Sequence, residues 1–88
     1  MGTMTAPRSI TRTARREEIA SLARYRRAQD VRLVDLAARS GYSVPHLSRV
    51  LNCKRPISIA EVRALRANIA ELAREAIAAA NAPKEPRA

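Results

Sequence analysis

Apolar residues recur every three or four positions through most of the chain, and this spacing is typical of helices with one buried face. Near the N-terminal end, Ile19 and Leu22 follow the spacing, and Thr13 precedes them as a candidate N-cap. Acidic residues in the first turn favour the positive end of the helix dipole. The pattern predicts a first helix that starts after Thr13 and ends near Asp30.

Two short helices are predicted next, separated by a turn at Gly41. Glycine tolerates the left-handed conformation that a sharp turn requires. Ala37 supplies a small side chain where two steeply crossing helices approach each other. Ser43 is placed to cap the second short helix, and Pro45 lies in its first turn, where the missing N–H costs nothing. We expect this helix to end near Asn52 and to bury three side chains: Leu47, Val50 and Leu51.

The strongest start signal lies at Ser58, which forms a capping box with Glu61. A regular apolar seam follows and predicts a helix that runs to about residue 80. The seam consists of Val62, Leu65, Ile69, Leu72 and Ala76. We expect the first two residues of the seam to pack inward. The remaining three, together with the neighbouring Ile77, are expected to form a dimer interface: Ile69, Leu72, Ala76 and Ile77. The alternative is a monomer in which the helix folds back entirely on the first helix.

These patterns together predict an all-α fold, a compact bundle of about four helices that contains a helix-turn-helix and ends in a long C-terminal helix. The ordered domain is expected over residues 13–80. Residues 1–12 have no apolar periodicity and are interpreted as a disordered basic arm, and residues 81–88 as a disordered tail. With 88 residues in all, the core is thin.

The amino-acid composition favours one class of binding partner. Lysine and arginine number 17 against 8 acidic residues, a net charge of +9, and all the basic residues except Lys54 and Lys84 are arginine. Guanidinium groups form bidentate hydrogen bonds with phosphate and with the edge of guanine, which favours a nucleic-acid partner. The alternative is that a GC-rich genome produces the arginine and that the charge serves only solubility.

Several other classes of function have little support. No apolar run is long enough to span a membrane and no signal peptide is visible, so we expect a cytoplasmic protein. The only cysteine is Cys53, and we expect its thiol to be inert; a redox sensor is the less favoured alternative. The only histidine is His46. A metal site, a cofactor, a small-molecule ligand and enzymatic activity are therefore not expected.

The stretch RLVDLAARSGYSVPHLSRVLNCKRPIS, residues 32–58, resembles the helix-turn-helix of the Cro/C1-type (XRE-like) family of repressors. It is also similar to the headpiece of the LacI family, whose members often have SRVLNGKRPVS at this place. The resemblance implies a second short helix that enters the major groove of DNA. It also implies a protein encoded by a bacterium or phage and associated with the nucleoid. Cys53 stands where these families usually carry glycine, so we expect Asn52 to take the left-handed conformation instead. Leu33 replaces a glutamine that buttresses the DNA backbone, and we assign it to the core.

The face of the reading helix opposite its buried side is expected to meet the bases through Ser43, Val44, Pro45, Ser48, Arg49 and Asn52. Arg49 is the best candidate for a guanine edge, and the alternative is a simple phosphate contact. Basic residues around the motif are expected to bind phosphates: Arg32, Arg39, His46, Lys54 and Arg55. A solvated surface position is the alternative for His46.

The leading hypothesis is a sequence-specific transcriptional regulator that binds double-stranded DNA as a homodimer, a repressor that covers a palindromic operator. The alternative is a protein-interaction module, antitoxin-like or docking on a polymerase, in which the last helix binds a partner and DNA contact is secondary. A basic amphipathic peptide at a membrane surface is a weaker hypothesis. The capping box and the glycine turn argue against it, because interfacial helices need neither.

Overall fold

Four helices make up the regular structure of residues 12–81, the part of the chain that the computed structural model describes. They are α2 (Arg16–Ala28), α3 (Leu33–Ser40), α4 (Val44–Leu51) and α5 (Ile59–Asn81). The prediction of an all-α fold with about four helices and a long C-terminal helix is confirmed. The predicted tail from residue 82 on, and the predicted arm up to residue 11, lie outside the described residues.

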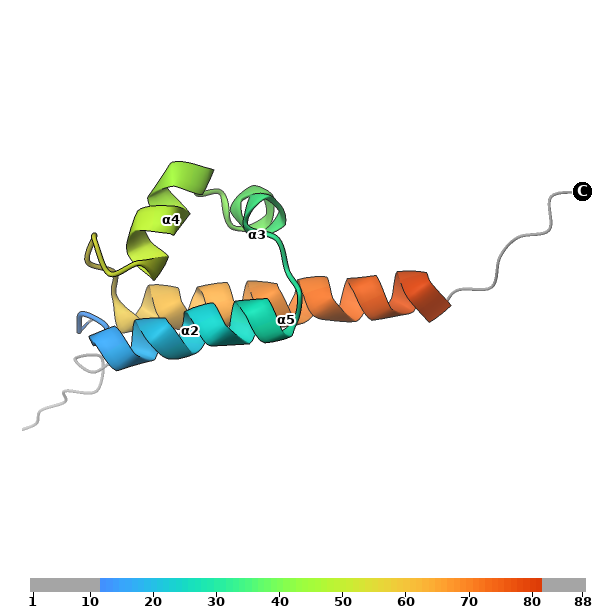
Figure 1. Cartoon of the computed structure of the whole chain (residues 1–88), viewed down its shortest axis with the longest axis horizontal. Helices are drawn as coiled ribbons and strands as arrows, with labels where there is room; N and C mark the ends of the chain where they lie inside the picture. The colour runs from blue at the N-terminus through green and yellow to red at the C-terminus, as the bar shows by residue number, and fades with distance from the viewer. Residues whose placement is uncertain (1–11, 82–88) are drawn as a thin grey trace, which may run out of the picture.

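The helices form two layers (Figure 1). In one layer α2 runs alongside the first part of α5, and in the other α3 and α4 cross over this pair. α5 packs on α2 and α3, whereas α4 packs on α3 and α2 and, within residues 12–81, not on α5. The C-terminal part of α5 extends beyond the other helices as a free rod.

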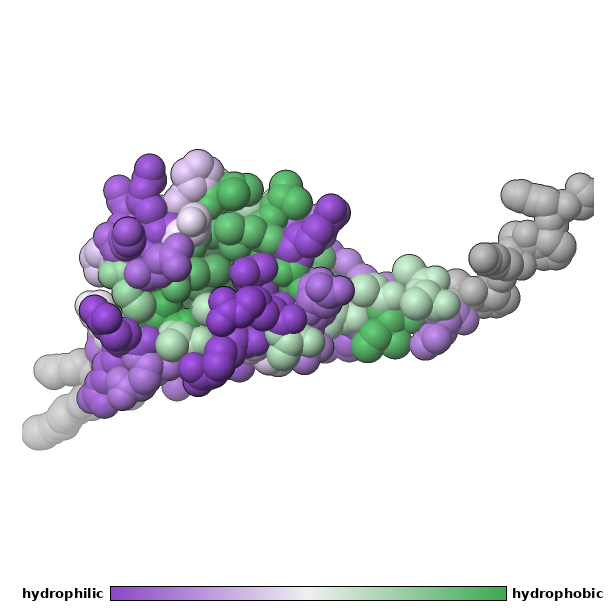
Figure 2. Space-filling model, viewed as in Figure 1, coloured by the Kyte–Doolittle hydropathy of each residue, from purple (hydrophilic) through white to green (hydrophobic). Residues whose placement is uncertain are grey.

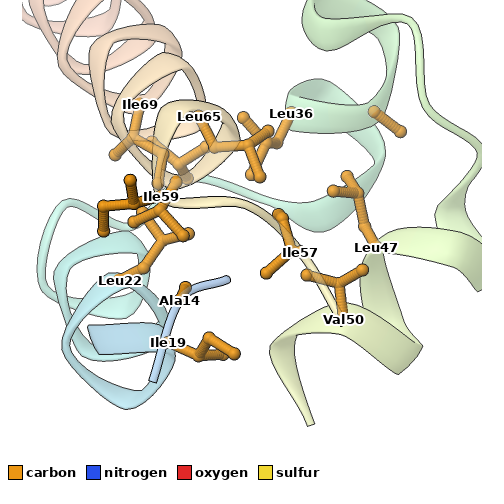
Figure 3. Packing of buried hydrophobic residues seen from close by; sticks show 13 residues of the cluster. Ala14, Ile19, Leu22, Leu36, Leu47, Val50, Ile57, Ile59, Leu65 and Ile69 are labelled. Atoms are coloured by element: carbon orange, nitrogen blue, oxygen red, sulfur yellow. The ribbon is translucent and has the colours of Figure 1, made fainter. Parts of the chain in front are cut away.

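The core lies between the layers. Its fully buried side chains come from all four helices and include Leu22, Leu36, Leu47, Val50, Leu65 and Ile69. Figure 3 shows Ile57, from the loop before α5, pointing into the space between Val50 and the α2–α5 pair. Ile57 is 4% exposed, so a loop residue fills the centre of the core. At roughly 25 cal/mol per Å² of buried apolar surface, these side chains supply the main stabilising term.

The start of α2 differs from the prediction. Thr13 does not cap the helix, because its backbone pairs with Ser58 in an isolated antiparallel bridge. The amide of Ala14 donates to the Ile57 carbonyl at 2.7 Å, and the Ile59 amide donates to the Arg12 carbonyl at 2.8 Å. The segments that lead into α2 and α5 are thus tied together, and Arg12, assigned to the arm, belongs to the folded domain.

Glu18, and not Thr13, supplies the side-chain hydrogen bond to the backbone at the start of α2. Its carboxylate accepts the backbone N–H of Arg15 at 2.7 Å and the guanidinium of Arg12 at 3.0 Å. The Arg12 hydrogen bond and then the Arg15 amide lower the pKa of Glu18 to about 2. This carboxylate therefore stays ionised and keeps its two contacts at any pH well above that value.

Left-handed residues end the first three helices. Gly41 (φ +86°) ends α3, as predicted, and its amide donates to the Ala37 carbonyl at 2.9 Å. After α4 the prediction was wrong: Asn52 has φ −99°, and Cys53 itself is left-handed at φ +61°. The Cys53 amide donates to Val50 and the Lys54 amide to Arg49, which is the Schellman pattern. The pattern puts the left-handed position one residue later than Asn52.

Replacing Cys53 with glycine should therefore raise the free energy of unfolding. A left-handed L-residue costs roughly 1–2 kcal/mol, and the greater flexibility of unfolded glycine offsets roughly 0.5–1 kcal/mol of the gain. We expect a net stabilisation of about 0.5–1 kcal/mol in urea unfolding. Asn52→Gly is the matched control and should destabilise, because φ −99° is open to any residue. A Cys53→Gly variant less stable than the parent would contradict this account.

The capping box at the start of α5 is confirmed. The Ser58 amide donates to the Glu61 carboxylate, and the Glu61 amide donates to the Ser58 hydroxyl, both at 3.1 Å. The helix continues to Asn81, one residue past the predicted end. In the described part of the chain, neither α5 nor any other helix combines the length and hydropathy that crossing a membrane requires.

The inward-facing part of α5 is longer than predicted. Ile69, expected at a dimer interface, is 0% exposed and packs beside Leu65 in the core of its own chain (Figure 3). Leu72 is half-buried against the same core. The reason is that α2 and α3 both contact α5 beyond Leu65: Tyr25 of α2 packs against Arg66, and Arg39 of α3 pairs with Glu71 and Glu75. Of the four residues predicted for the interface, only Ala76 and Ile77 are freely exposed.

Candidate nucleic-acid interface

The segment predicted as a helix-turn-helix consists of α3, the turn at residues 41–43, and α4. Figure 1 shows α3 almost end-on while α4 lies near the plane of the view, so the two short helices cross steeply. Ala37 is buried, as expected of a small side chain at the crossing, and Leu47 of α4 is 0% exposed beneath it. The crossing holds α4 at the outside of the domain with one face buried and the other in solvent.

The predicted base-reading residues lie on the outer side of α4. Ser43, Val44, Pro45, Arg49 and Asn52 are exposed, and Ser48 is half-buried. Leu47 and Val50 form the buried side, and Leu51 is half-buried against the core. The Ser43 hydroxyl accepts the His46 amide at 3.2 Å and caps the helix as predicted. Arg49 has no ion-pair partner among residues 12–81, so its guanidinium is available to a ligand.

Asn52 is less free than the prediction assumes. Its side-chain amide donates to the Ser48 carbonyl at 2.8 Å, one turn back on α4. The same carbonyl accepts the Asn52 backbone N–H at 3.1 Å, and the side-chain nitrogen also lies 3.5 Å from the Ser48 hydroxyl. Within residues 12–81, the hydrogen bonds of the Asn52 amide nitrogen therefore both go to Ser48. Arg49 therefore carries the larger unengaged hydrogen-bonding capacity on this face.

His46 packs against Tyr42 rather than standing clear of the surface. The two rings lie 4.9 Å apart between centroids at an angle of 53°. The Tyr42 hydroxyl donates to the Glu61 carboxylate at 2.7 Å, and this bond, followed by burial, raises the pKa of Tyr42 to about 12. Glu61 thus holds both the start of α5 and the turn before α4. The sequence analysis missed Tyr42, because its partner lies in another helix.

The predicted phosphate-binding residues divide into free and engaged groups. Lys54 and Arg55 are exposed in the loop after α4 and have no ion-pair partner within residues 12–81. Arg32 pairs with Asp35 at 3.1 Å, but its side chain is 75% exposed, so the pair is weak and easily exchanged.

The side chain of Arg39, which was predicted to bind phosphate, forms ion pairs within the fold instead. Its guanidinium donates to Glu71 at 3.0 Å and to both oxygens of Glu75 at 2.6 and 2.7 Å. Two carboxylates of α5 therefore neutralise it and hold it away from the outer face of α4. Arg39 ties α3 to α5, and a role in binding phosphate does not agree with this geometry.

Two negative observations complete the site. Within residues 12–81, no group of three or more His, Cys, Asp or Glu side chains is arranged to hold a metal ion. Comparison of the chain with protein-family models, with curated proteins and with solved structures finds no match. The resemblance of residues 32–58 to the Cro/C1-type family therefore stays a prediction.

Proposed function

We propose that this protein binds double-stranded DNA in a sequence-specific way and regulates transcription, with α4 as the reading helix. The observation that carries the proposal is the outer face of α4, where exposed Arg49 stands opposite fully buried Leu47 on a steeply crossed helix pair. A helix held in this way can enter the major groove, which admits one α-helix. Lys54 and Arg55, directly after α4, provide charge for the adjoining phosphates.

Repression by occupancy is the simplest mechanism for this domain. A protein that covers a promoter needs only affinity and sequence preference, and both would come from α4 and the basic residues around it. Arg49 would read a guanine edge through two parallel hydrogen bonds, with Val44 against a thymine methyl and Ser48 as an adaptable donor or acceptor. Lys54, Arg55 and Arg32 would fix the register by contacting phosphates.

Duplex binding should depend steeply on salt. Each phosphate contact lowers the slope of log affinity against log salt concentration by about 0.9, because bound counterions are released. We expect a preferred site to bind with a Kd of roughly 10⁻⁸ to 10⁻¹¹ M at physiological salt. Fluorescence anisotropy with labelled duplexes at several salt concentrations measures both quantities. A Kd weaker than about 10⁻⁴ M for every duplex would contradict the proposal.

We propose further that the protein acts as a homodimer joined through the protruding end of α5. The apolar stripe of α5 continues past the core into Ala76, Ile77 and Ala80, which nothing in the described chain covers. Figure 2 shows hydrophobic residues exposed on this rod, and Ile77 is 58% exposed. One reading helix covers too few base pairs to select a genomic site, whereas two related by symmetry cover a palindrome.

Light scattering tests the dimer. At micromolar concentration we expect a mass of about twice the 9.7 kDa chain. Ile77→Glu should give a monomer, because it puts a charge into the proposed apolar contact, while Ala78→Glu on the other side of the helix should not. A mass near 9.7 kDa at every concentration would rule the dimer out.

The alternative function is a protein-interaction module, and the same exposed end of α5 is the observation that favours it. In that case α5 would bind a different protein and DNA binding would be weak and without sequence preference. The two functions separate experimentally, since only the first predicts a preferred duplex sequence.

A further inference from the structure

The two helices that flank α4 differ in their charge. α3 and α2 both pack on α4, whereas α5 lies across the core from it. Both α3 and α2 therefore lie next to the helix on which a duplex would rest. The α3 flank has no unpaired base among residues 12–81, since Arg32 is paired with Asp35 and Arg39 with Glu71 and Glu75.

The α2 flank has the opposite character. Arg16, Arg24 and Arg27 are exposed and make no ion pair with any residue of 12–81. Small half-buried alanines, Ala20 and Ala23, lie between them along the helix, so no carboxylate separates the guanidinium groups on this flank. Figure 2 shows hydrophilic residues gathered over α2 and at the outer edge of α4 on the same face of the molecule.

The charges on α2 are sorted by side. Tyr25 and Ser21 turn toward α5, where the Arg66 guanidinium lies 4.9 Å from the Tyr25 ring and donates to the Ser21 hydroxyl at 3.2 Å. The acidic residues Glu17 and Glu18 line the groove between α2 and α5. At roughly 100° per residue, Arg16 and Arg27 project from the side of α2 opposite Tyr25, whereas Arg24 lies about 60° from Arg27, in nearly the same direction as Glu17.

We infer that α2 is the main phosphate-binding flank of the interface, with Arg16 and Arg27 contacting the DNA backbone beside the groove that α4 enters. This inference rests on the proposed function. It adds backbone contact from the helix before the helix-turn-helix to the contact proposed for Arg32 at the start of α3, while Ala37 and the Arg39 ion pairs hold α4 in place. Arginine suits the role because its planar fork matches two phosphate oxygens. Such contacts position the protein but carry no base preference.

A pair of double variants with equal charge change tests the inference in the full chain. Arg16→Gln with Arg27→Gln removes two charges from the α2 flank. Arg63→Gln with Arg74→Gln removes two from exposed sites on α5, across the core from α4, that also lack ion pairs within residues 12–81. We expect the α2 pair to reduce the salt slope by about 0.9 per arginine and to weaken all duplexes alike. The α5 pair should leave the slope unchanged.

An unchanged slope for the α2 pair, or an equal reduction for both pairs, would overturn the inference. Loss of preference at particular base pairs would also overturn it, because it would make these arginines base readers. If the α2 pair melts early, the single variant Arg27→Gln near the end of α2 carries the same test, with an expected reduction of about 0.9 for each bound subunit. Failure of the parent protein to bind any duplex is a different result, and it would count against the proposed function itself.

Discussion

Replacing Leu47 by alanine is expected to unfold most of the protein at physiological temperature. Leu47 is 0% exposed and packs between α3 and the rest of the core, beside Val50 and near Ile57 (Figure 3). Removing a buried leucine side chain costs roughly 2–5 kcal/mol, which combines lost apolar burial with the cavity left behind. A small domain has a total stability near the low end of about 5–15 kcal/mol, so this loss is most of what is available.

Thermal unfolding followed by circular dichroism at 222 nm measures the effect. Val34→Ala is the matched control: Val34 lies on the neighbouring helix α3, but it is 53% exposed, so its melting curve should stay close to that of the parent. If Leu47→Ala melted at the parent's temperature, the packing of α4 described above would be wrong.

Replacing Arg49 by alanine should leave the fold intact and remove one element of sequence preference. Arg49 is exposed and makes no ion pair within residues 12–81, so its loss costs the domain little. If its guanidinium holds a guanine through O6 and N7, the change should cost about 1–3 kcal/mol for each half-site of the preferred duplex and relax preference at one base position in each half. A panel of single-base variants of that duplex measures both effects.

Arg55→Ala serves as the comparison, since it removes the same charge from the loop after α4. It should weaken every duplex of the panel by a similar factor and reduce the salt slope by about 0.9 for each bound subunit. Should Arg49→Ala also weaken the whole panel uniformly, Arg49 would be a phosphate contact and the base-reading assignment would be wrong.

The helices were predictable from sequence because their signals are local. Gly41 as a stop, Ser43 as a cap and the Ser58–Glu61 box each act within one turn of the chain, and all three are present. What the sequence did not reveal depends on contacts across the fold. Ile57 and Ala14 are core residues outside any periodic pattern, because a backbone pairing between the two helix entrances buries them.

Side-chain roles on the surface were predictable only in part. The exposed face of α4 follows from helical spacing, so the exposure of Arg49 could be predicted. The engagement of Arg39 could not, because Glu71 and Glu75 lie 32 and 36 residues further along the chain. The burial of Ile69 was missed for a similar reason: the seam is regular along its length, and only the reach of α2 and α3 decides where it becomes exposed.

Selection of bound sequences from a pool of random duplexes, run in parallel with the parent protein and with Arg49→Ala, tests most directly whether α4 reads DNA. The account predicts that the parent enriches a palindromic site with half-sites about 10–10.5 base pairs apart, centre to centre, or a multiple of this spacing. Arg49→Ala should enrich the same site with one position in each half relaxed. A parent protein that enriches no sequence, or an Arg49→Ala pool identical to the parent's, would contradict it.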